Sequence, residues 1–387
     1  MRSFCKTFHF TKLLLTVVFV GLLGMSTGIL PAAQAAESVS TSTKPIKVSA
    51  WNNGFGLLDD QGDVWYLGKR VPTKVKGLDH VIDISYGRNG LAVKEDGTVW
   101  IWGENGDQST QTTWFYSMIK PLQIPELKNI VKVSSSNGLF AALDSDGTVW
   151  TWCFAVQQLD DLTKFDQKPI AIPGLHKVKD ITIVHGKVIA LQEDGTVWRS
   201  EGIDPLTVTW TGGNVEITKN STYTITTKQI PGLTDIIELG KGTDTLHLLT
   251  LKKDGTVWAW GSNHYGQLIG QQGEAEPWNA IQVPGLSDIV ALSSGWTHSL
   301  ALKKDGTLWE WGYFTTNEID SYKRLTTPVQ VKGLDQVKAI SSGISFNTVI
   351  QEDGTLWAWG GNDGGQLHDN TNVSKFSPIK FMFPSTR

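Results

Sequence analysis

The sequence predicts an all-β chain that folds as a seven-bladed β-propeller. Three observations predict this fold: an internal repeat of about 50 residues, an Asp-Gly turn at the same place in six of the seven copies, and short strand-like runs without an amphipathic helix. A unit of this length with four short strands fits one blade of a propeller. Each copy places a tryptophan three residues after a glycine, and these are Trp65, Trp100, Trp150, Trp198, Trp258, Trp309 and Trp357.

The N-terminal segment, residues 1–35, is predicted to be a secretory signal peptide and not part of the fold. Its basic residues precede an apolar run over 13–23, and the small residues Ala33 and Ala35 then form a cleavage site. A membrane anchor is the alternative, but the apolar run is shorter than the roughly 20 residues that a membrane span needs. We therefore expect a signal peptide over 1–35 and a propeller over 36–387.

The predicted mature chain is mildly acidic, because loss of the three basic residues of the signal peptide lowers the formal net charge from −4 to −7. This charge argues against a nucleic-acid partner or an anionic membrane surface, which favour a basic face. Cys153 is the only cysteine left, so no internal disulfide can form. We expect a secreted monomer, free or associated with the cell wall, that does not insert into the membrane after cleavage.

The strands of one blade can be assigned most clearly in the sixth copy. Residues 288–293 are expected to form a first strand and residues 298–302 a second. Asp305 and Gly306 provide a tight hairpin turn. Residues 307–311 and 327–331 are then the third and fourth strands, so that four antiparallel strands make one blade.

The two ends of the mature chain are expected to close the ring together. Residues 47–51 correspond to a first strand and residues 377–383 to a fourth strand. We therefore expect the N- and C-terminal strands to pair in one blade, which would remove the exposed edges of an open array.

The repeated residues are interpreted first as structural. The repeat tryptophans stand where adjacent blades must pack face to face. The turn aspartates of the Asp-Gly pairs are expected to bond their own backbone, and not to act in catalysis.

Two longer motifs give the sequence a family resemblance. The runs 260–268 and 359–367 read Trp-Gly-x-Asn-x-x-Gly-Gln-Leu, and Gly295 and His298 precede Ala-Leu in a second motif. The chain thus resembles the regulator of chromosome condensation repeat family, whose members are seven-bladed propellers. The resemblance is specific in the last three blades.

Departures from the family pattern occur in the middle of the chain. Cys153 stands where the third blade should have glycine, and Ser200 stands where the fourth should have its second tryptophan. The motif histidine survives only at His247 and His298, which are interpreted as packing residues. No short cluster of histidine, cysteine and carboxylate residues supports a metal site, and no cofactor is predicted.

The candidate binding residues gather at one end of the blades. In an antiparallel blade the turn after the first strand and the loop after the third strand emerge at one end, here called the loop end. The Asp-Gly turns emerge at the other, here called the Asp-Gly end. The predicted partner-binding residues, all at the loop end, are Trp51, Tyr86, Trp114, Phe115, Tyr116, Trp210, His264, Tyr265, Trp278, Trp296, Tyr313 and Phe314.

The function predicted from these observations is recognition of another protein without catalysis. The layout is similar to that of the secreted bacterial β-lactamase inhibitor of propeller type in this family, so the resemblance implies an extracellular or cell-envelope protein partner and possible enzyme inhibition. The alternative is a secreted carbohydrate-active or lyase-type propeller enzyme. No catalytic residue is predicted, because neither paired carboxylates in a distinctive setting nor a nucleophile motif occurs.

Overall fold

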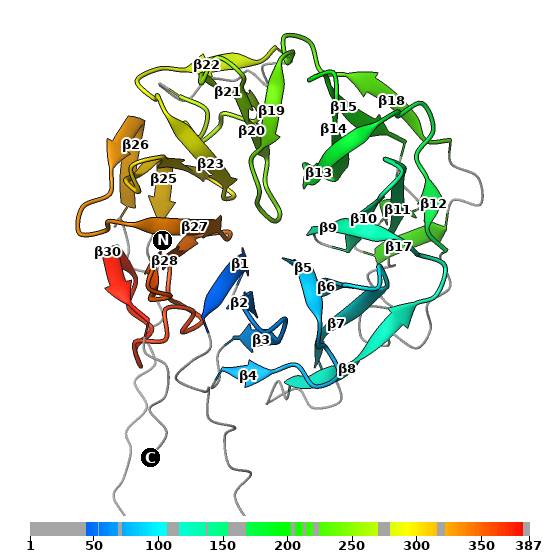
Figure 1. Ribbon diagram of the computed structural model, residues 1–387, viewed down its shortest axis with the longest axis horizontal. Helices are drawn as coiled ribbons and strands as arrows, with labels where there is room; N and C mark the ends of the chain where they lie inside the picture. The colour runs from blue at the N-terminus through cyan, green and yellow to red at the C-terminus, as the bar shows by residue number, and fades with distance from the viewer. Residues whose placement is uncertain are drawn as a thin grey trace, which may run out of the picture. The chain divides into compact units, whose positions relative to one another are not determined.

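Within the residues that the computed structural model describes, the strands form seven four-stranded antiparallel sheets. The sheets stand around a common centre, with the first strand of each sheet innermost (Figure 1). All of these residues lie in one compact unit, Glu37–Arg387. The described residues are 44–52, 54–68, 72–106, 116–136, 138–153, 168–202, 206–211, 214–219, 224–269, 279–315 and 322–381.

Each of the first three blades is built from four consecutive strands, and the fourth blade from three consecutive strands and a later one. The first blade comprises β1 (Pro45–Trp51), β2 (Gly54–Asp59), β3 (Val64–Leu67) and β4 (Thr73–Lys74). The second comprises β5 (Val81–Tyr86), β6 (Asn89–Lys94), β7 (Val99–Gly106) and β8 (Tyr116–Ile124). The third comprises β9 (Ile130–Ser136), β10 (Leu139–Asp144), β11 (Val149–Cys153) and β12 (Ile170–Ala171). The fourth comprises β13 (Val178–Val184), β14 (Lys187–Gln192), β15 (Val197–Glu201) and β18 (Thr226–Gln229).

The last three blades repeat this order. The fifth comprises β19 (Ile236–Leu239), β20 (His247–Lys252), β21 (Val257–Gly261) and β22 (Ile281–Val283). The sixth comprises β23 (Ile289–Ser294), β24 (His298–Lys303), β25 (Leu308–Thr315) and β26 (Tyr322–Gln330). The seventh comprises β27 (Val337–Ser342), β28 (Phe346–Gln351), β29 (Leu356–Gly360) and β30 (Lys375–Lys380). The predicted all-β, seven-bladed propeller of four-stranded antiparallel blades is thus confirmed.

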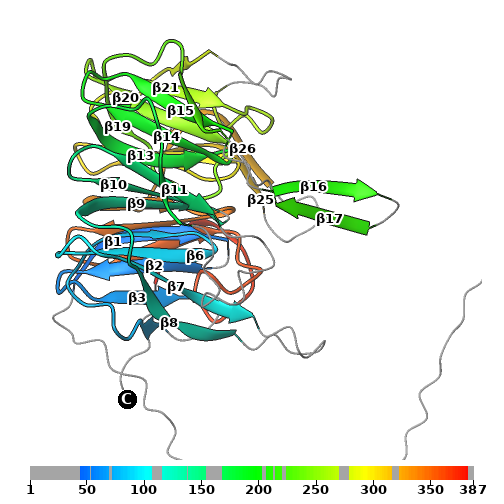
Figure 2. The same ribbon diagram turned by 90° about the vertical axis from the view of Figure 1, so that its right-hand side faces the viewer.

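One insertion interrupts the fourth blade. Strands β16 (Leu206–Thr211) and β17 (Asn214–Lys219) pair as a separate hairpin between β15 and β18. The hairpin stands out from the body of the blades (Figure 2). The unusually long interval between Trp198 and Trp258 therefore corresponds to an extra hairpin.

The Asp-Gly turns join the second and third strands and also fix the position of the next blade. In the second blade, Asp96 Oδ1 accepts hydrogen bonds from the N–H and the hydroxyl of Thr98, at 2.9 and 2.6 Å. Gly97 has a φ of +75°, and an added Cβ would lie 2.8 Å from the Cα of Asn129, at the start of the third blade. Glycine is needed here both for the left-handed backbone and for this close approach. The aspartate bonds its own turn, as predicted.

Adjacent blades pack through the second tryptophan of the third strand. Phe140 and Trp152 of the third blade, for example, form one buried cluster with Leu91 and Val93 of the second. The tryptophans at this second position are at most 5% exposed, and they are Trp102, Trp152, Trp260, Trp311 and Trp359. The first tryptophans pack at the margins of the same clusters and are mostly half-buried. Blade packing therefore depends more on the second tryptophan than the repeat motif predicts.

The ring does not close by pairing of the terminal strands, and this prediction was wrong. Strand β1 pairs with β2 in the first blade, and β30 pairs with β29 in the seventh. Residues 47–51 and 375–380 do serve as a first and a fourth strand, but in two different, complete blades. Side chains close the ring instead, because Phe55 of the first blade and Phe381, after β30, lie in one buried cluster.

Candidate functional site

Three of the predicted aromatic residues form a partly exposed cluster at the loop end of the fifth and sixth blades, in which Trp296 is exposed and Tyr265 and Tyr313 are half-buried. Tyr265 lies in the loop after β21, Trp296 in the turn after β23, and Tyr313 in β25. The ring centroid of Tyr265 is 6.0 Å from that of Trp296 and 5.8 Å from that of Tyr313. The side chain of Trp296 is 40% exposed. Such a group of rings offers a partner a large apolar area that also has polar edges.

The loop that carries Tyr265 is held by its own motif residues. Asn263 Oδ1 accepts a hydrogen bond from Leu268 N at 3.0 Å, and Gln267 Oε1 accepts one from Tyr265 N at 2.8 Å. Trp311 Nε1 of the next blade donates to Gln267 O at 2.9 Å. The family motif therefore fixes the loop to the scaffold, which keeps the cluster in place. His264 lies beside Tyr265 in the same loop and is exposed.

Two predicted binding residues are buried and do not contribute to this surface. Tyr86 is 4% exposed and stacks on Trp102, with ring centroids 5.0 Å apart. Phe314 is 3% exposed and packs on His298, with centroids 4.8 Å apart. Both are packing residues, which corrects their assignment to the binding face.

The side chains of five further predicted residues are not described by the structure. Tyr116 begins β8 and Trp210 lies in β16, and only their backbones are described. Trp114, Phe115 and Trp278 lie outside the described residues.

Trp51 is half-buried and contacts a loop that crosses the centre of the propeller. This plug loop, residues 240–246 between β19 and β20, extends toward the centre of the ring (Figure 1). Asp244 accepts hydrogen bonds from Trp51 Nε1 of the first blade and from Ser136 Oγ of the third, the latter at 2.7 Å. Thr243 Oγ1 donates to Ala50 O of the first blade. The plug loop therefore joins the fifth blade to blades on the far side of the ring.

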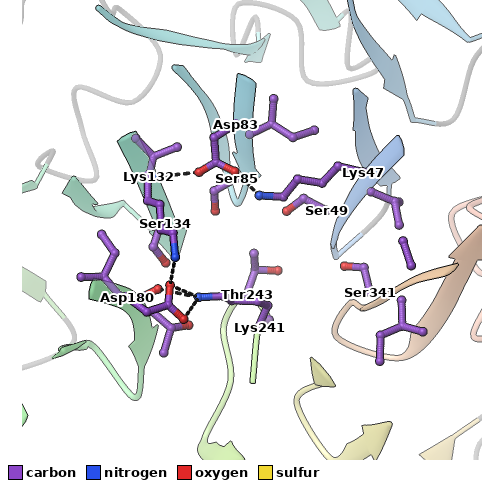
Figure 3. Close-up of a pocket in the computed structure, with 18 residues that line it drawn as sticks. Lys47, Ser49, Asp83, Ser85, Lys132, Ser134, Asp180, Lys241, Thr243 and Ser341 are labelled. Atoms are coloured by element: carbon purple, nitrogen blue, oxygen red, sulfur yellow. Dashed lines mark hydrogen bonds and ion pairs between the residues drawn. The ribbon is translucent and has the colours of Figure 1, made fainter. Parts of the chain in front are cut away.

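A cavity of about 190 Å³ lies on the Asp-Gly side of the plug loop, and charged residues of the inner strands line it. Lys47 pairs with Asp83, while Lys132 and Lys241 both pair with Asp180, at 3.0 and 2.6 Å respectively (Figure 3). Burial raises the pKa of Asp180, but Lys241 and Lys132 outweigh burial and the pKa is lowered. The lining therefore carries three lysines and two carboxylates.

Glu238 of β19 is a further carboxylate near this network. Burial is the largest cause of a rise in its pKa to about 7, with Lys241 opposing and Asp180 adding to the rise. Sequence reasoning missed these central residues. They could have been found from the sequence, because the third residue of each inner strand lies at an equivalent position in its blade. These residues are Lys47, Asp83, Lys132, Asp180, Glu238, Ala291 and Ala339.

A second cavity, of about 260 Å³, lies between the fourth and fifth blades and includes Arg199, Lys228 and Trp260 in its lining. The guanidinium carbon of Arg199 lies 5.5 Å from the ring centroid of Trp260. At the interface between the fifth and sixth blades, Leu268, the last residue of the Trp-Gly-x-Asn-x-x-Gly-Gln-Leu motif, is fully buried in the cluster that contains Trp311. The fourth blade has no such motif, because its third strand leads into the inserted hairpin.

The two motif histidines are buried between blades. His247 Nε2 lies 2.7 Å from Ser299 Oγ, and His298 Nε2 lies 2.8 Å from Asn347 Oδ1. Burial lowers the pKa of His247 to about 3 and that of His298 to about 4. In the part of the chain that the structure describes, no three His, Cys, Asp or Glu side chains are grouped so that they could hold a metal ion. None of the described segments forms a helix of the length and apolarity needed to cross a membrane.

Comparison with protein families identifies the repeat. A family model described as regulator of chromosome condensation (RCC1) repeat matches residues 254–302 and 353–387, and a second model with this description matches residues 337–366. These matches fall in the last three blades, where the two sequence motifs occur.

Curated relatives match only short segments. Protein RCC1 of Candida albicans is 33% identical over 96 residues, which cover 23% of this chain and 20% of the relative. The ultraviolet-B receptor UVR8 of Arabidopsis thaliana is 31% identical over 75 residues, which cover 19% of this chain and 17% of the receptor. The probable E3 ubiquitin-protein ligase HERC6 of Homo sapiens is 32% identical over 103 residues, which cover 26% of this chain and 10% of the ligase. The matched segments thus span at most 20% of these relatives.

Solved structures match over most of the chain. Human WBSCR16 has a TM-score of 0.60 and 18% identity, and the match covers 82% of this chain and 87% of that one. Yeast RCC1 (Prp20), solved with bound Kap60, has a TM-score of 0.61 and 16% identity, with 92% of both chains covered. At identities of 16% and 18%, the similarity shows that these proteins share the fold of this chain.

Proposed function

From the RCC1 repeats that the chain carries in its last three blades, on a seven-bladed propeller, we propose that it is a recognition protein without enzymatic activity, which binds another protein through the loop end. The observation that carries this proposal is the partly exposed cluster of Tyr265, Trp296 and Tyr313. Aromatic residues provide much of the binding energy at protein interfaces.

The cluster suits binding because its backbone is already fixed. Thr297 Oγ1, in the turn of Trp296, donates to Tyr313 O at 2.7 Å, and Tyr265 is held through Gln267. Little conformational entropy is therefore lost when a partner docks on these rings. The similar yeast RCC1 propeller was solved bound to another protein, Kap60, which supports a protein as the class of partner.

The partner that we propose is an extracellular or cell-envelope protein. This part of the proposal depends on the N-terminal segment, whose basic, apolar and small residues have the order of a signal peptide. Inhibition of a partner enzyme would be one consequence of such binding.

A pull-down with residues 36–387 against secreted and envelope proteins tests the proposal. The matched variants are Tyr265→Ala/Trp296→Ala/Tyr313→Ala at the loop end and Ile170→Ala/Val329→Ala, two exposed apolar residues of the outer strands β12 and β26. We expect one protein to be retained by the wild type and by the control, and lost by the aromatic variant with an unchanged melting temperature. Equal retention by all three, or no retained protein, would rule out the loop end as the binding face.

One observation favours the alternative of a carbohydrate-active or lyase-type enzyme. The pKa values of Asp180 and Glu238 are shifted in opposite directions near the central cavity, as in enzymes that use one carboxylate as an acid and another as a base. Both oxygens of Asp180, however, bond Lys241 at 2.6 and 2.7 Å. Turnover of a glycan substrate that is lost in Glu238→Gln and in Asp180→Asn would favour the enzyme over the recognition protein.

A further inference from the structure

A ring of exposed apolar side chains surrounds the central cavity at the Asp-Gly end, away from the aromatic cluster. It is formed by the second residue of each inner strand. Five of these seven positions hold isoleucine or valine, with 39–48% of each residue exposed: Ile46, Ile82, Val131, Ile237 and Val290. The other two positions hold Lys179 and Lys338. We call the five isoleucine and valine residues the apolar ring.

A repeated β-bulge explains why these residues are exposed. In the second blade, Val81 pairs with Lys94 and Asp83 pairs with Val93, so that Ile82 has no opposite residue. The same register shift occurs at the start of the inner strand in every blade. A bulge residue is left unpaired in the ladder, and a bulge changes the direction of a side chain. Isolated exposed apolar residues are common, but five of them at equivalent positions around one opening, interrupted by Lys179 and Lys338, are of the kind that marks a binding surface.

Lysines outnumber carboxylates in the lining of the cavity inside the apolar ring. Five of the seven bulge residues are followed directly by a residue of the cavity lining, and the three cavity lysines keep 41–51% of their side chains exposed. Only Asp83 and Asp180 face them as carboxylates in the cavity lining. Glu238 adds little negative charge below neutral pH, because burial raises its pKa to about 7. The cavity lining therefore carries one more positive than negative formal charge, with its lysines paired to Asp83 and Asp180, although the whole chain has a formal net charge of −4.

The rim of the same face carries charges of both signs, because Lys253 and Lys304 directly precede Asp254 and Asp305 in their turns and are exposed. The exposed turn aspartates lie further out on the blades, and they are Asp96, Asp146, Asp194, Asp254, Asp305 and Asp353. Because the three lysines line a cavity, a narrow projection of a partner can reach them more readily than a broad surface.

We propose that the Asp-Gly end binds a protruding loop or chain end of a partner protein, in which an acidic residue flanked by apolar residues enters the central cavity. The acidic side chain pairs with Lys47, Lys132 or Lys241. The flanking apolar residues cover the apolar ring. This site is at the opposite end from the aromatic cluster, so that either proposal can fail without the other.

The probe is a library of displayed random peptides. Peptides are first depleted on the variant Ile82→Ser/Ile237→Ser/Val290→Ser and then selected on the wild-type chain, residues 36–387. We expect selected peptides to carry Asp or Glu between apolar residues. Synthetic copies should bind the wild type about tenfold or more tightly than this variant, because three apolar contacts are lost. The matched control is Ile170→Ser/Val329→Ser/Val373→Ser, whose residues are 36–47% exposed on the outer strands and loops, and it should bind like the wild type.

The lysines provide an independent variant if the serine variant does not fold. Lys47→Gln/Lys132→Gln keeps the ring apolar, and it should weaken binding of the same peptides by about tenfold and reduce the dependence of binding on salt. Selection of peptides without an acidic residue would overturn the proposal, as would equal binding to the wild type and the lysine variant. A library from which no peptide is retained would also overturn it.

Discussion

The hydroxyl of Ser341 in the seventh blade accepts a hydrogen bond of 2.9 Å from the backbone N–H of Ala50 in the first blade. The same bond joins other neighbours in the ring: Ser49 accepts from Tyr86 N at 2.8 Å, and Ser293 accepts from Ser342 N at 2.9 Å. The bond between Ser341 and Ala50 therefore continues a regular contact across the point where the chain begins and ends. This contact joins the first and seventh blades, where the sequence predicted that the N- and C-terminal strands would pair in one blade.

Loss of this hydroxyl should weaken the closure. In Ser341→Ala the buried N–H of Ala50 loses its acceptor, which should lower the free energy of unfolding by about 1–3 kcal/mol. Chemical denaturation measures the change, and Ser287→Ala, at an exposed serine, serves as the control. Hydrogen exchange of the Ala50 amide should become faster in the Ser341 variant. An unchanged exchange rate would show that closure does not depend on this bond.

Apolar packing at the same closure should contribute more. Phe381 is 4% exposed and packs on Phe55 of the first blade with centroids 5.6 Å apart. Phe381→Ala should therefore lower the free energy of unfolding by about 3–5 kcal/mol. Phe376, which is 37% exposed, provides the control in Phe376→Ala. Equal denaturation midpoints for the two variants would contradict packing of the chain end against the first blade.

The plug loop should stabilise the ring from its centre. Asp244→Ala removes the acceptor of Trp51 Nε1 and of Ser136 Oγ, two bonds that tie the fifth blade to the first and third. We expect the free energy of unfolding to fall by about 2–4 kcal/mol, since bonds to a charged acceptor are stronger than neutral ones. Asp244→Asn keeps one acceptor oxygen and should fall between the wild type and the alanine variant. Denaturation that does not distinguish the three proteins would assign the loop no role in stability.

The fold was predictable from the sequence because its signals are local. An Asp-Gly turn, a period of two in the flanking strands and a tryptophan at a fixed offset place each blade, and strands β23 to β26 occur close to their predicted ranges. The ring closure was not predictable in this way. Residues 47–51 and 377–383 fit their strand roles in one shared blade or in two complete blades, and the choice depends on long-range packing.

The site was predictable only in part, for a related reason. The sequence placed Tyr265, Trp296 and Tyr313 at one end, and the structure brings them together. It did not separate them from Phe314, because β25 continues to Thr315, beyond its predicted end at residue 311. The plug loop could not be recognised, because Asp244 bonds residues 108 and 193 positions away in the sequence.

Acid should destabilise the chain through its buried histidines. Burial lowers the pKa of His298 to about 4 from 6.5, so the unfolded chain binds this proton first as the pH falls. The stabilisation is complete above pH 6.5 and is lost as the pH falls toward 4. His298→Phe, which copies Phe346 at the same place in the seventh blade, should flatten the dependence of unfolding free energy on pH in this window. An unaltered slope would exclude His298 as its source.

Glu238 should make the folded chain less stable as the pH rises. Its pKa rises to about 7 in the folded chain from 4.5, mainly through burial, so the folded chain binds the proton more tightly than the unfolded chain. The stabilisation is complete below pH 4.5 and is lost as the pH rises through 7. Glu238→Gln cannot ionise, and should therefore lose less stability than the wild type between pH 5 and 8, by up to about 3 kcal/mol. Glu352→Gln, at an exposed glutamate, should follow the wild type. Parallel curves for the wild type and Glu238→Gln across this range would mean that the carboxylate near Asp180 and Lys241 is ionised in the folded chain already at pH 5.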